Sequence, residues 1–367
     1  MTALRIPCSS PAPREDREAV RAAIDRVLDS GWFILGPEVS AFEAEFAAAC
    51  RVPHAVGVGN GTDAIALILR ALGIGPGDEV ITTPLSAAYT ALAIMMVGAR
   101  PVFADIDPVR LTVDPQAMAA AVTPRTRALL PVHLYGQAAD MAAIESIAAR
   151  HSLPIVEDCC QAHLATAAGR PVGSIGVAAA FSFYPTKNLG ALGDGGAVIT
   201  SDAALADTVR RLRNGGQSDR YHHELPGINS RLDEMQAAIL RARLPFLQDW
   251  TAARRRLAQT YRRELADGPQ TVTPVPECDN GHAYHLFVAR TSRRDALQDH
   301  LRARGIETLV HYPVPIPHQR ALAGERPAEC PAANLACREV VSLPLYPGLT
   351  ASAVSEVAAA VRDFHEV

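Results

Sequence analysis

A lysine with small neighbours is the side chain with the clearest chemical potential in this sequence. Lys187 follows an apolar run that ends at Phe183, lies among glycines and small residues, and has a nearby hydroxyl at Ser182. A lysine in a turn is usually a solvated surface group. When burial or a nearby cation removes its proton, however, a lysine can form a Schiff base with an aldehyde. The Ser182 hydroxyl could bind a phosphate beside it.

Two acids end a second apolar run. Ile155 and Val156 lead into Glu157 and Asp158, and ligands of open α/β sheets bind at the carboxyl ends of such strands. We therefore expect Asp158 to face a ligand and Glu157 to point the other way. A carboxylate there could keep a pyridinium nitrogen protonated, and the alternative is a helix N-cap. Gln161 would share this environment.

A glycine-rich turn from Gly57 to Asp63 supplies further polar atoms. Backbone N–H groups at a helix start bind phosphate with the help of the helix dipole, and Thr62 can add a hydroxyl. The spacing fits neither the Rossmann nor the Walker pattern, and the alternative is a tight turn capped by Thr62 or Asp63. Phosphate donors, a carboxylate and a lysine are together the protein groups that pyridoxal phosphate requires.

These groups need a scaffold of alternating strands and helices. Between residues 55 and 201, short β-branched runs alternate with helical patterns, which predicts an α/β fold with a mostly parallel central sheet flanked by helices. The expected strands cover residues 55–58, 79–83, 101–105, 128–132, 155–158, 179–183 and 197–200. The expected helices cover residues 14–28, stopped by Gly31, and 63–72, 87–97 and 138–150.

The length of the chain predicts two domains. We expect a large cofactor-binding domain with an N-terminal helix over residues 1–245 and a smaller α+β C-terminal domain over residues 246–367. Residues 230–266 predict a long helix, or a pair kinked at Pro245, that links the two. In the second domain we expect a strand at 285–289 and helices at 293–304 and 353–364.

Composition excludes several classes of protein. The 367 residues carry 35 Lys plus Arg against 39 Asp plus Glu, so nucleic acid is not an expected partner. The one basic cluster, Arg254 to Arg256, fits the solvated face of a helix. Seven cysteines without metal-ligand spacing predict no metal site and reduced thiols in the cytoplasm. We expect no export signal and no membrane span, because no uncharged apolar run reaches about 18 residues.

Taken together, the sequence resembles the fold type I pyridoxal-phosphate (PLP) aminotransferases, and specifically the DegT/DnrJ family of sugar aminotransferases. The likeness covers nearly the whole chain and implies the fold type I PLP-dependent transferase architecture. Jointly the matching segments are highly specific. They cover residues 30–39, 59–63, 157–163, 181–190, 227–237, 284–288 and 311–313.

The resemblance also implies roles for individual residues. Lys187 would carry the cofactor in a Schiff base, and Asp158 would pair with the pyridine nitrogen. The asparagine that matches Asn229 reaches the cofactor phosphate of the neighbouring subunit in similar proteins, which implies a homodimer with shared active sites; the alternative is a helix N-terminal turn residue. The other cofactor-binding residues would be Gly61, Thr62 and Ser182 at the phosphate and Gln161 near the ring hydroxyl.

Two positions depart from the family's pattern. The family usually places an aromatic residue or a histidine over the cofactor ring, and the matching residue here is Ala87. Tyr89, two residues later, is a candidate substitute. Leu164 stands where a glycine is common after Gln-Ala-His, which indicates a reshaped pocket.

The implied activity is transfer of an amino group from L-glutamate or L-glutamine to a nucleotide-linked keto-deoxy-sugar, in the biosynthesis of deoxyamino sugars and natural products. A keto-cyclitol of the inosose type is an alternative acceptor. A non-catalytic PLP-binding sensor is a second alternative, which the lack of a basic helix-turn-helix segment disfavours. The expected substrate-binding residues, each with a structural role as its alternative, are His163, Arg231, His311 and Tyr312.

Overall fold

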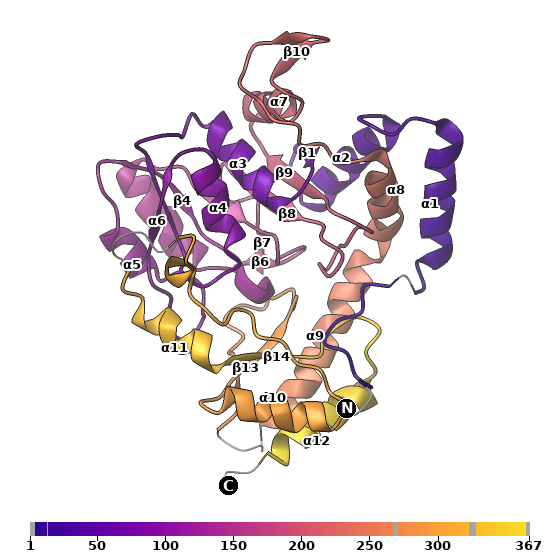
Figure 1. Ribbon diagram of the computed structural model, residues 1–367, viewed down its shortest axis with the longest axis vertical. Coiled ribbons are helices and arrows are strands. Elements are labelled where there is room, and N and C mark those ends of the chain that lie inside the picture. Colours follow the sequence, from indigo (N-terminus) through magenta and orange to yellow (C-terminus); the bar gives the residue numbers. More distant parts are fainter. Residues whose placement is uncertain (1–3, 13, 267–270, 323–327, 365–367) are drawn as a thin grey trace.

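The computed structural model describes residues 4–12, 14–266, 271–322 and 328–364. It has a large α/β part and a smaller part at the opposite end of the molecule, and the helix α9 runs from one to the other (Figure 1). Within the described ranges, no helix is long and apolar enough to cross a membrane.

Seven strands of the large part follow the spatial order β1-β9-β8-β5-β4-β2-β3. Only β9 runs antiparallel to its neighbours, and β5 joins β4 through parallel bridges from Ile155 to Leu129 and from Asp158 to Val132. The central sheet is therefore mostly parallel, as predicted. The bounds are β1 (His54–Val58), β2 (Glu79–Thr82), β3 (Arg100–Phe103), β4 (Thr126–Leu130), β5 (Val156–Asp158), β8 (Ala178–Ser182) and β9 (Gly196–Thr200).

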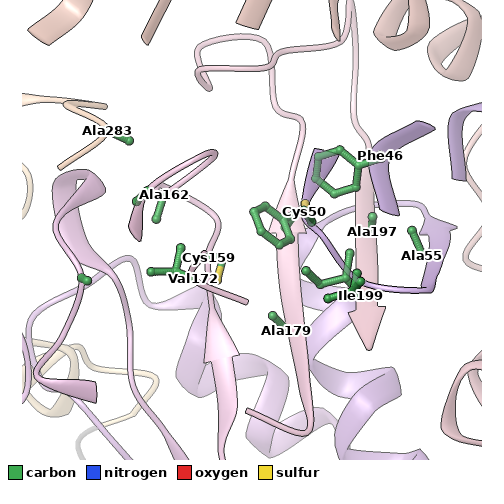
Figure 2. Packing of buried hydrophobic residues seen from close by; sticks show 14 of the residues in the cluster. Phe46, Cys50, Ala55, Cys159, Ala162, Val172, Ala179, Ala197, Ile199 and Ala283 are labelled. Carbon is green, nitrogen blue, oxygen red and sulfur yellow. The ribbon is translucent and has the colours of Figure 1, made fainter. Parts of the chain in front are cut away.

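Helices cover both faces of this sheet because alternate strand residues point to opposite sides. In β8, Ala179 packs into one apolar core and Ala180 into the other. Figure 2 shows the first core, in which Phe46 of α2 lies near Ile199 of β9. The helices of that face are α2 (Pro37–Ala49), α5 (Pro115–Ala120) and α6 (Met141–His151), and those of the other are α3 (Gly61–Ala71), α4 (Tyr89–Met96) and α7 (Ala203–Leu212).

The smaller part has a three-stranded antiparallel sheet and a core of its own. That core includes Ile6, which forms a parallel bridge with Ile306, so the N-terminal segment packs with the smaller part. We propose the bend at Pro245 as the boundary between two domains. The elements are α9 (Leu247–Leu265), β12 (Thr273–Pro274), β13 (Phe287–Arg290), α10 (Arg294–Ala303), η3 (Ile316–His318), α11 (Pro331–Glu339), β14 (Val340–Leu343) and α12 (Ala351–Arg362).

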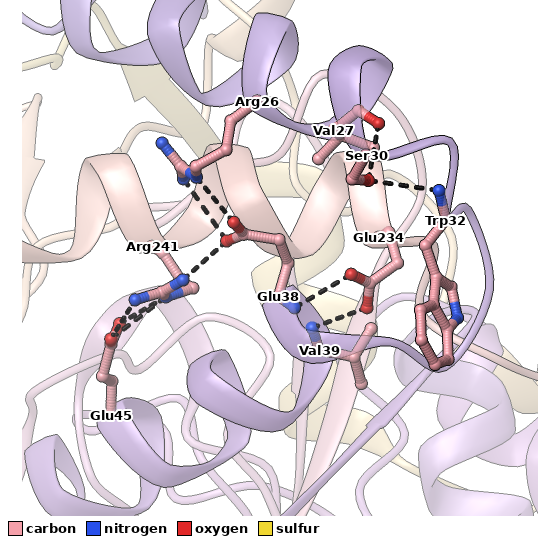
Figure 3. A network of polar contacts seen from close by, with 9 residues as sticks. All are labelled: Arg26, Val27, Ser30, Trp32, Glu38, Val39, Glu45, Glu234 and Arg241. Atoms are coloured by element: carbon pink, nitrogen blue, oxygen red, sulfur yellow. Dashed lines mark hydrogen bonds and ion pairs between the residues drawn. The ribbon is translucent and has the colours of Figure 1, made fainter.

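A polar network fixes the entry into the linking helices. Glu234, the first residue of α8 (Glu234–Arg243), accepts hydrogen bonds from the backbone N–H groups of Gly36, Glu38 and Val39 at the start of α2, at 2.8 to 2.9 Å. Figure 3 shows this cap beside the ion pairs of Glu38 with Arg26 and Arg241. A carboxylate at a helix N-terminus is favoured by free N–H groups and by the helix dipole. The network joins α2 and α8 to α1 (Arg17–Ser30).

The predicted elements compare closely with the observed ones. All seven predicted strands of the large part are present, and α1 ends at Ser30, just before Gly31, whose φ of 63° is left-handed. Pro245 lies in the short helix η2 (Leu244–Phe246) that separates α8 from α9, which confirms the kinked pair. The sequence analysis did not predict α2, α5, α7, α11, β12 and β14. Further short elements are η1 (Leu134–Gly136), β6 (Thr166–Ala167), β7 (Arg170–Pro171), β10 (Gln217–Asp219) and β11 (His222–His223).

One surface assignment was wrong. Arg256 is exposed, but Arg254 is only 5% exposed, so these arginines do not form one solvated face. The physical reason is that Arg254 lies on the buried side of α9, where its Nη1 donates to the carbonyl oxygens of Tyr284, His285 and Leu345. A run of like residues on a helix cannot reveal which member faces inward.

Candidate active site

A cavity of about 880 Å³ opens at the carboxyl ends of the parallel strands, where ligands of α/β sheets bind. Asp158 ends β5, Ser182 ends β8 and Gly61 begins α3, and all three line it. His311 and Tyr312 of the smaller part also reach it. Nine of the twelve candidate site residues of the sequence analysis line this cavity: Gly61, Thr62, Tyr89, Asp158, Gln161, Ser182, Lys187, His311 and Tyr312.

Lys187 is the only lysine in the whole sequence, and its side chain is partly buried in this cavity. Its backbone N–H donates to the carbonyl oxygen of Tyr184 at 2.8 Å, which closes a turn after β8. Burial lowers the pKa of the Lys187 ammonium below its ordinary value, and the charge of Asp158 opposes that shift. The Cys160 thiol does not add a charge, because burial raises its pKa well above the ordinary value. The lowered pKa raises the neutral, nucleophilic fraction of Lys187 at a given pH.

Asp158 is oriented from two sides. Its Oδ2 accepts a hydrogen bond from the Thr90 hydroxyl at 2.7 Å, and its Oδ1 accepts one from the backbone N–H of Cys160 at 3.1 Å. Asp158 is 5% exposed and faces the cavity. Since each carboxylate oxygen has more than one lone-pair site, the group can also receive a donor from a ligand.

Glu157 points to the opposite side of the strand, as expected. It accepts hydrogen bonds from the backbone N–H groups of Gly173, Ile175 and Gly176 at 2.7 to 2.9 Å. The His133 Nε2 lies 3.0 Å from Glu157 Oε2, and its Nδ1 accepts from Ala139, so the ring proton is on Nε2. Burial opposes ionisation of Glu157, but these hydrogen bonds outweigh it and lower its pKa.

His133, Glu157 and Cys159 form the one buried cluster of metal-ligand types found within the described residues. The His133 and Glu157 atoms are already engaged with each other and with backbone groups. Burial also raises the pKa of the Cys159 thiol well above its ordinary value, which disfavours the thiolate that a metal needs. The cluster therefore supports the loop after β7 and is not a metal site.

The start of α3 is shaped to receive a phosphate. The Asn60 side chain accepts from the N–H of Asp63, and the N–H groups of Gly61 and Thr62 have no acceptor in the described part of the chain. A Cβ at position 61 would lie 2.7 Å from Cys160 Sγ and 3.0 Å from Ser182 Cβ, so only glycine leaves this backbone open. Free N–H groups at a helix start, together with the hydroxyls of Thr62 and Ser182, fit the phosphate of pyridoxal phosphate.

Gln161 connects the sheet edge to the smaller part. Its Oε1 accepts from the backbone N–H of Tyr135 at 2.7 Å, and its Nε2 donates to the Tyr312 hydroxyl at 2.9 Å. The Tyr135 hydroxyl in turn donates to the carbonyl oxygen of His311. Burial lowers the pKa of the His311 imidazole to about 4, with help from the Lys187 charge, so a neutral ring faces the cavity at neutral pH.

Three of the residues expected at the site do not line this cavity. His163 is 1% exposed and lies edge-on to Phe181, at 5.3 Å between ring centroids. Arg231 donates to the Asn214 side chain at 3.0 Å, and Asn229 is exposed and forms an antiparallel bridge with the same residue. Sequence reasoning on one chain cannot distinguish a residue behind the site from one that serves another subunit.

The two departures from the family's pattern have distinct structural settings. Ala87 and Tyr89 both line the cavity, and Tyr89 is 64% exposed. Leu164 has a φ of 58°, in the left-handed region that favours glycine, which accounts for glycine being common there.

Functional residues that the sequence analysis missed are Thr90, which orients Asp158, and His285, which lines the cavity. The pKa of His285 lies well below the ordinary value, first because of burial and then because of the Lys187 charge. A hydroxyl in the first turn of a helix that follows a strand was the available signal for Thr90. No local signal marks His285.

Comparison with known proteins agrees with this geometry. A model of the DegT/DnrJ/EryC1/StrS aminotransferase family matches residues 14–362. The chain is 52% identical over 357 residues to dTDP-3-amino-3,4,6-trideoxy-alpha-D-glucose transaminase of Streptomyces venezuelae, covering 97% of this chain and 94% of the relative. It is 50% identical over 350 residues to the erythromycin biosynthesis sensory transduction protein EryC1 of Saccharopolyspora erythraea, covering 95% and 96%. Among solved structures, S. venezuelae DesV in complex with a ketimine intermediate is 50% identical, with 98% of each chain covered and a TM-score of 0.96.

Proposed function

Because the chain belongs to the DegT/DnrJ/EryC1/StrS aminotransferase family, we propose that it transfers an amino group from L-glutamate or L-glutamine to a nucleotide-linked keto-deoxy-sugar. It is a PLP-dependent aminotransferase. The observation that carries the proposed reaction is a cavity that holds the chain's only lysine, a strand-end carboxylate and an open phosphate cradle.

The cofactor, when bound, supplies an aldehyde for the donor amine and a pyridinium ring that withdraws electrons from the reacting carbon. We propose that the amine of Lys187 is the group that binds this aldehyde. Its lowered pKa leaves a larger neutral fraction at a given pH than an exposed lysine would have, and the neutral amine is the form that attacks a carbonyl. The same amine would also serve as the general base and acid that moves the proton of the donor's α-carbon.

We propose that the carboxylate of Asp158 pairs with the ring nitrogen. An anion beside that nitrogen raises its pKa and keeps it protonated, and each tenfold change in the protonation equilibrium corresponds to about 1.4 kcal/mol. Thr90 and the Cys160 N–H hold the carboxylate in one orientation, so little reorganisation is needed when the ring binds. Gly61, Thr62 and Ser182 would hold the phosphate, and Gln161 the side of the ring that bears the hydroxyl.

We also propose a homodimer in which Asn229 reaches the phosphate of the second subunit. Asn229 is exposed and lies outside the cavity of its own chain, which supports this role. Exposed apolar side chains lie on α4 beside the cavity: Tyr89 is 64% exposed, Met95 45% and Met96 47%. An apolar surface around a site rim is typical of a protein interface.

The proposed setting is the reducing cytoplasm and the biosynthesis of a natural product. All seven cysteines are free, and five of them are buried, which supports a reducing compartment. Support for the natural-product setting comes from EryC1, the relative named for erythromycin biosynthesis. His311 and Tyr312 are the residues that we propose to contact the sugar, since both line the cavity from the smaller part.

Assay of the purified holoenzyme tests the proposal. L-Glutamate or L-glutamine is supplied with nucleotide-linked 3-keto and 4-keto-6-deoxy sugars or with a keto-cyclitol, and products are followed by mass spectrometry. Amination of a nucleotide-linked sugar, with one keto acid formed for each amine transferred, supports it. Amination of the cyclitol alone establishes the alternative acceptor. A protein that binds PLP but aminates neither class is the sensor, and the proposal is then wrong.

A further inference from the structure

A second, smaller cavity adjoins the active site. It has a volume of about 140 Å³ and lies between residues 8–12 and 14–16 and the smaller part of the molecule. Thr186, Lys187, His285 and His311 line both cavities, so they form a common wall. Arg254 of α9 lines the smaller cavity and not the larger one. The chemistry assigned so far makes no use of this space.

Arg254 is buried with two of its three guanidinium nitrogens free of hydrogen bonds to the described residues. Its Nη1 donates to three carbonyl oxygens at 3.0 to 3.3 Å. Its Nε is buried without a partner, and Nη2 makes no hydrogen bond with any residue in the described ranges. Nε and Nη2 form the side edge of the guanidinium, the edge that binds a carboxylate through two parallel hydrogen bonds.

The charge of Arg254 is also uncompensated. No acidic oxygen within the described ranges lies close enough to pair with it, and burial alone lowers its pKa to about 10, so it stays a cation at neutral pH. Arg243, which lines the same cavity, shows the usual arrangement: its Nε binds Asp16 Oδ2 at 2.7 Å. A buried charge without a partner is costly, and a ligand anion would relieve that cost.

The proposed reaction requires such an anion next to Lys187. L-Glutamate and L-glutamine both carry an α-carboxylate, and no arginine is among the described residues that line the larger cavity. The imidazoles of His285 and His311 are favoured in their neutral forms there, because burial and the Lys187 charge lower their pKa values. Arg254 is therefore the buried permanent cation of the adjoining cavity whose side edge is free among the described residues.

We propose that the side edge of Arg254 binds the α-carboxylate of the amino donor. This inference rests on the proposed function and deepens it, since it names the residue that recognises the donor. The assignment fits either of the proposed donors, because glutamate and glutamine differ only at the far end of the side chain. The keto sugar has no carboxylate to place there, so Arg254 serves one half of the reaction.

Kinetics of the separate half-reactions test the proposal. In Arg254→Gln, the L-glutamate concentration that gives the half-maximal rate of the first half-reaction should rise about 30-fold, because a buried charge-assisted pair is lost. The KM for the keto sugar in the second half-reaction should stay within about twofold of wild type. Arg255→Gln is the matched control: Arg255 also donates to carbonyl oxygens, of His282 and Gly281, but lines neither cavity, and its donor dependence should be unchanged. Equal losses in both half-reactions would overturn the assignment.

A crystal structure of the wild-type holoenzyme with glutarate, a dicarboxylate without an amine, decides the matter even where Arg254→Gln fails to fold. A glutarate carboxylate on Nε and Nη2 of Arg254 is the expected result. Glutarate bound elsewhere, or absent at saturating concentration, overturns the inference. A wild-type enzyme that consumes neither glutamate nor glutamine contradicts the proposed function instead, and the glutarate structure still decides whether Arg254 binds carboxylates.

Discussion

Glu157 and Asp158 are adjacent acids at the end of β5, but they meet opposite surroundings. Glu157 is fully buried beneath the sheet, and backbone N–H groups and His133 use its oxygens. Asp158 faces the cavity with Lys187 and has two internal partners. A carboxylate with spare acceptor capacity beside a cavity can act on a ligand, whereas a fully engaged one can only hold structure.

This strand end thus has a cavity side and a buried side. On the cavity side, removal of a group should change catalysis while the protein stays folded. On the buried side, removal should change stability while each folded molecule keeps its activity. Substitutions on the two sides therefore separate chemistry from architecture.

The largest expected effect lies on the cavity side, at Lys187. Lys187→Ala should lower turnover by about 10,000-fold or more, because nucleophile and proton carrier are lost together. The thermal midpoint should change by only a few degrees. Steady-state assay and thermal melting of the same preparation measure both. Turnover within tenfold of wild type would refute the assignment of Lys187.

Asp158→Asn should come next. The amide keeps the shape but not the charge that holds the ring nitrogen protonated, so turnover should fall by about 1,000-fold, equal to about 4 kcal/mol. PLP should still bind, because the phosphate cradle is untouched. Rate measurements at saturating cofactor give the first quantity and cofactor titration gives the second. If Asp158→Asn lost stability instead of rate, the division between the two sides would fail.

Glu157→Gln reverses the pattern. The charge that accepts three backbone N–H groups is lost, so the free energy of unfolding should fall by about 3 kcal/mol. Turnover per folded molecule should stay within about threefold of wild type. Chemical denaturation measures the first, and an assay normalised to PLP content measures the second.

The pH dependence of the stabilisation by Glu157 tests the same comparison independently. Its folded pKa lies below the unfolded value, so its stabilisation is present above the unfolded pKa, near 4.5, and is lost as the pH falls through the folded pKa. Wild type should therefore lose its stability advantage over Glu157→Gln in that acid range. An advantage that stayed constant down to full unfolding would contradict the buried ion.

The smallest effect is expected at Thr90. Thr90→Val keeps the size of the side chain but removes the hydroxyl that orients Asp158, so kcat should fall about tenfold with little change in stability. Thr90→Ser, which keeps the hydroxyl, should restore most of the rate. Failure of serine to do better than valine would show that packing, and not the hydrogen bond, matters at this position.

The cavity side could largely be predicted from the sequence because its groups lie in short motifs. Asp158, Ser182 and Lys187 each end or follow an apolar strand, and the ends of neighbouring strands share one edge. The same local patterns predicted all seven strands of the sheet, and they gave the kink at Pro245 as one of two alternatives.

The groups that long-range packing brings together could not be predicted. Thr90 meets Asp158 across 68 positions of sequence, and Arg254 faces carbonyl oxygens that lie 30 to 91 positions away. The arginine cluster looked like a solvated surface because nothing in its own segment records what packs against α9. The helix α2 was missed, and its buried residues take part in the large core.

Covalent attachment of the cofactor tests the central claim most directly. The sequence has a single lysine, so borohydride reduction of the PLP-loaded protein can fix the cofactor on one ε-amine only. We predict one reduced pyridoxyl group per chain, located at Lys187 by peptide mass spectrometry, together with loss of the visible absorbance band and of activity. A reduced protein whose Lys187 peptide carries no added mass would contradict the account.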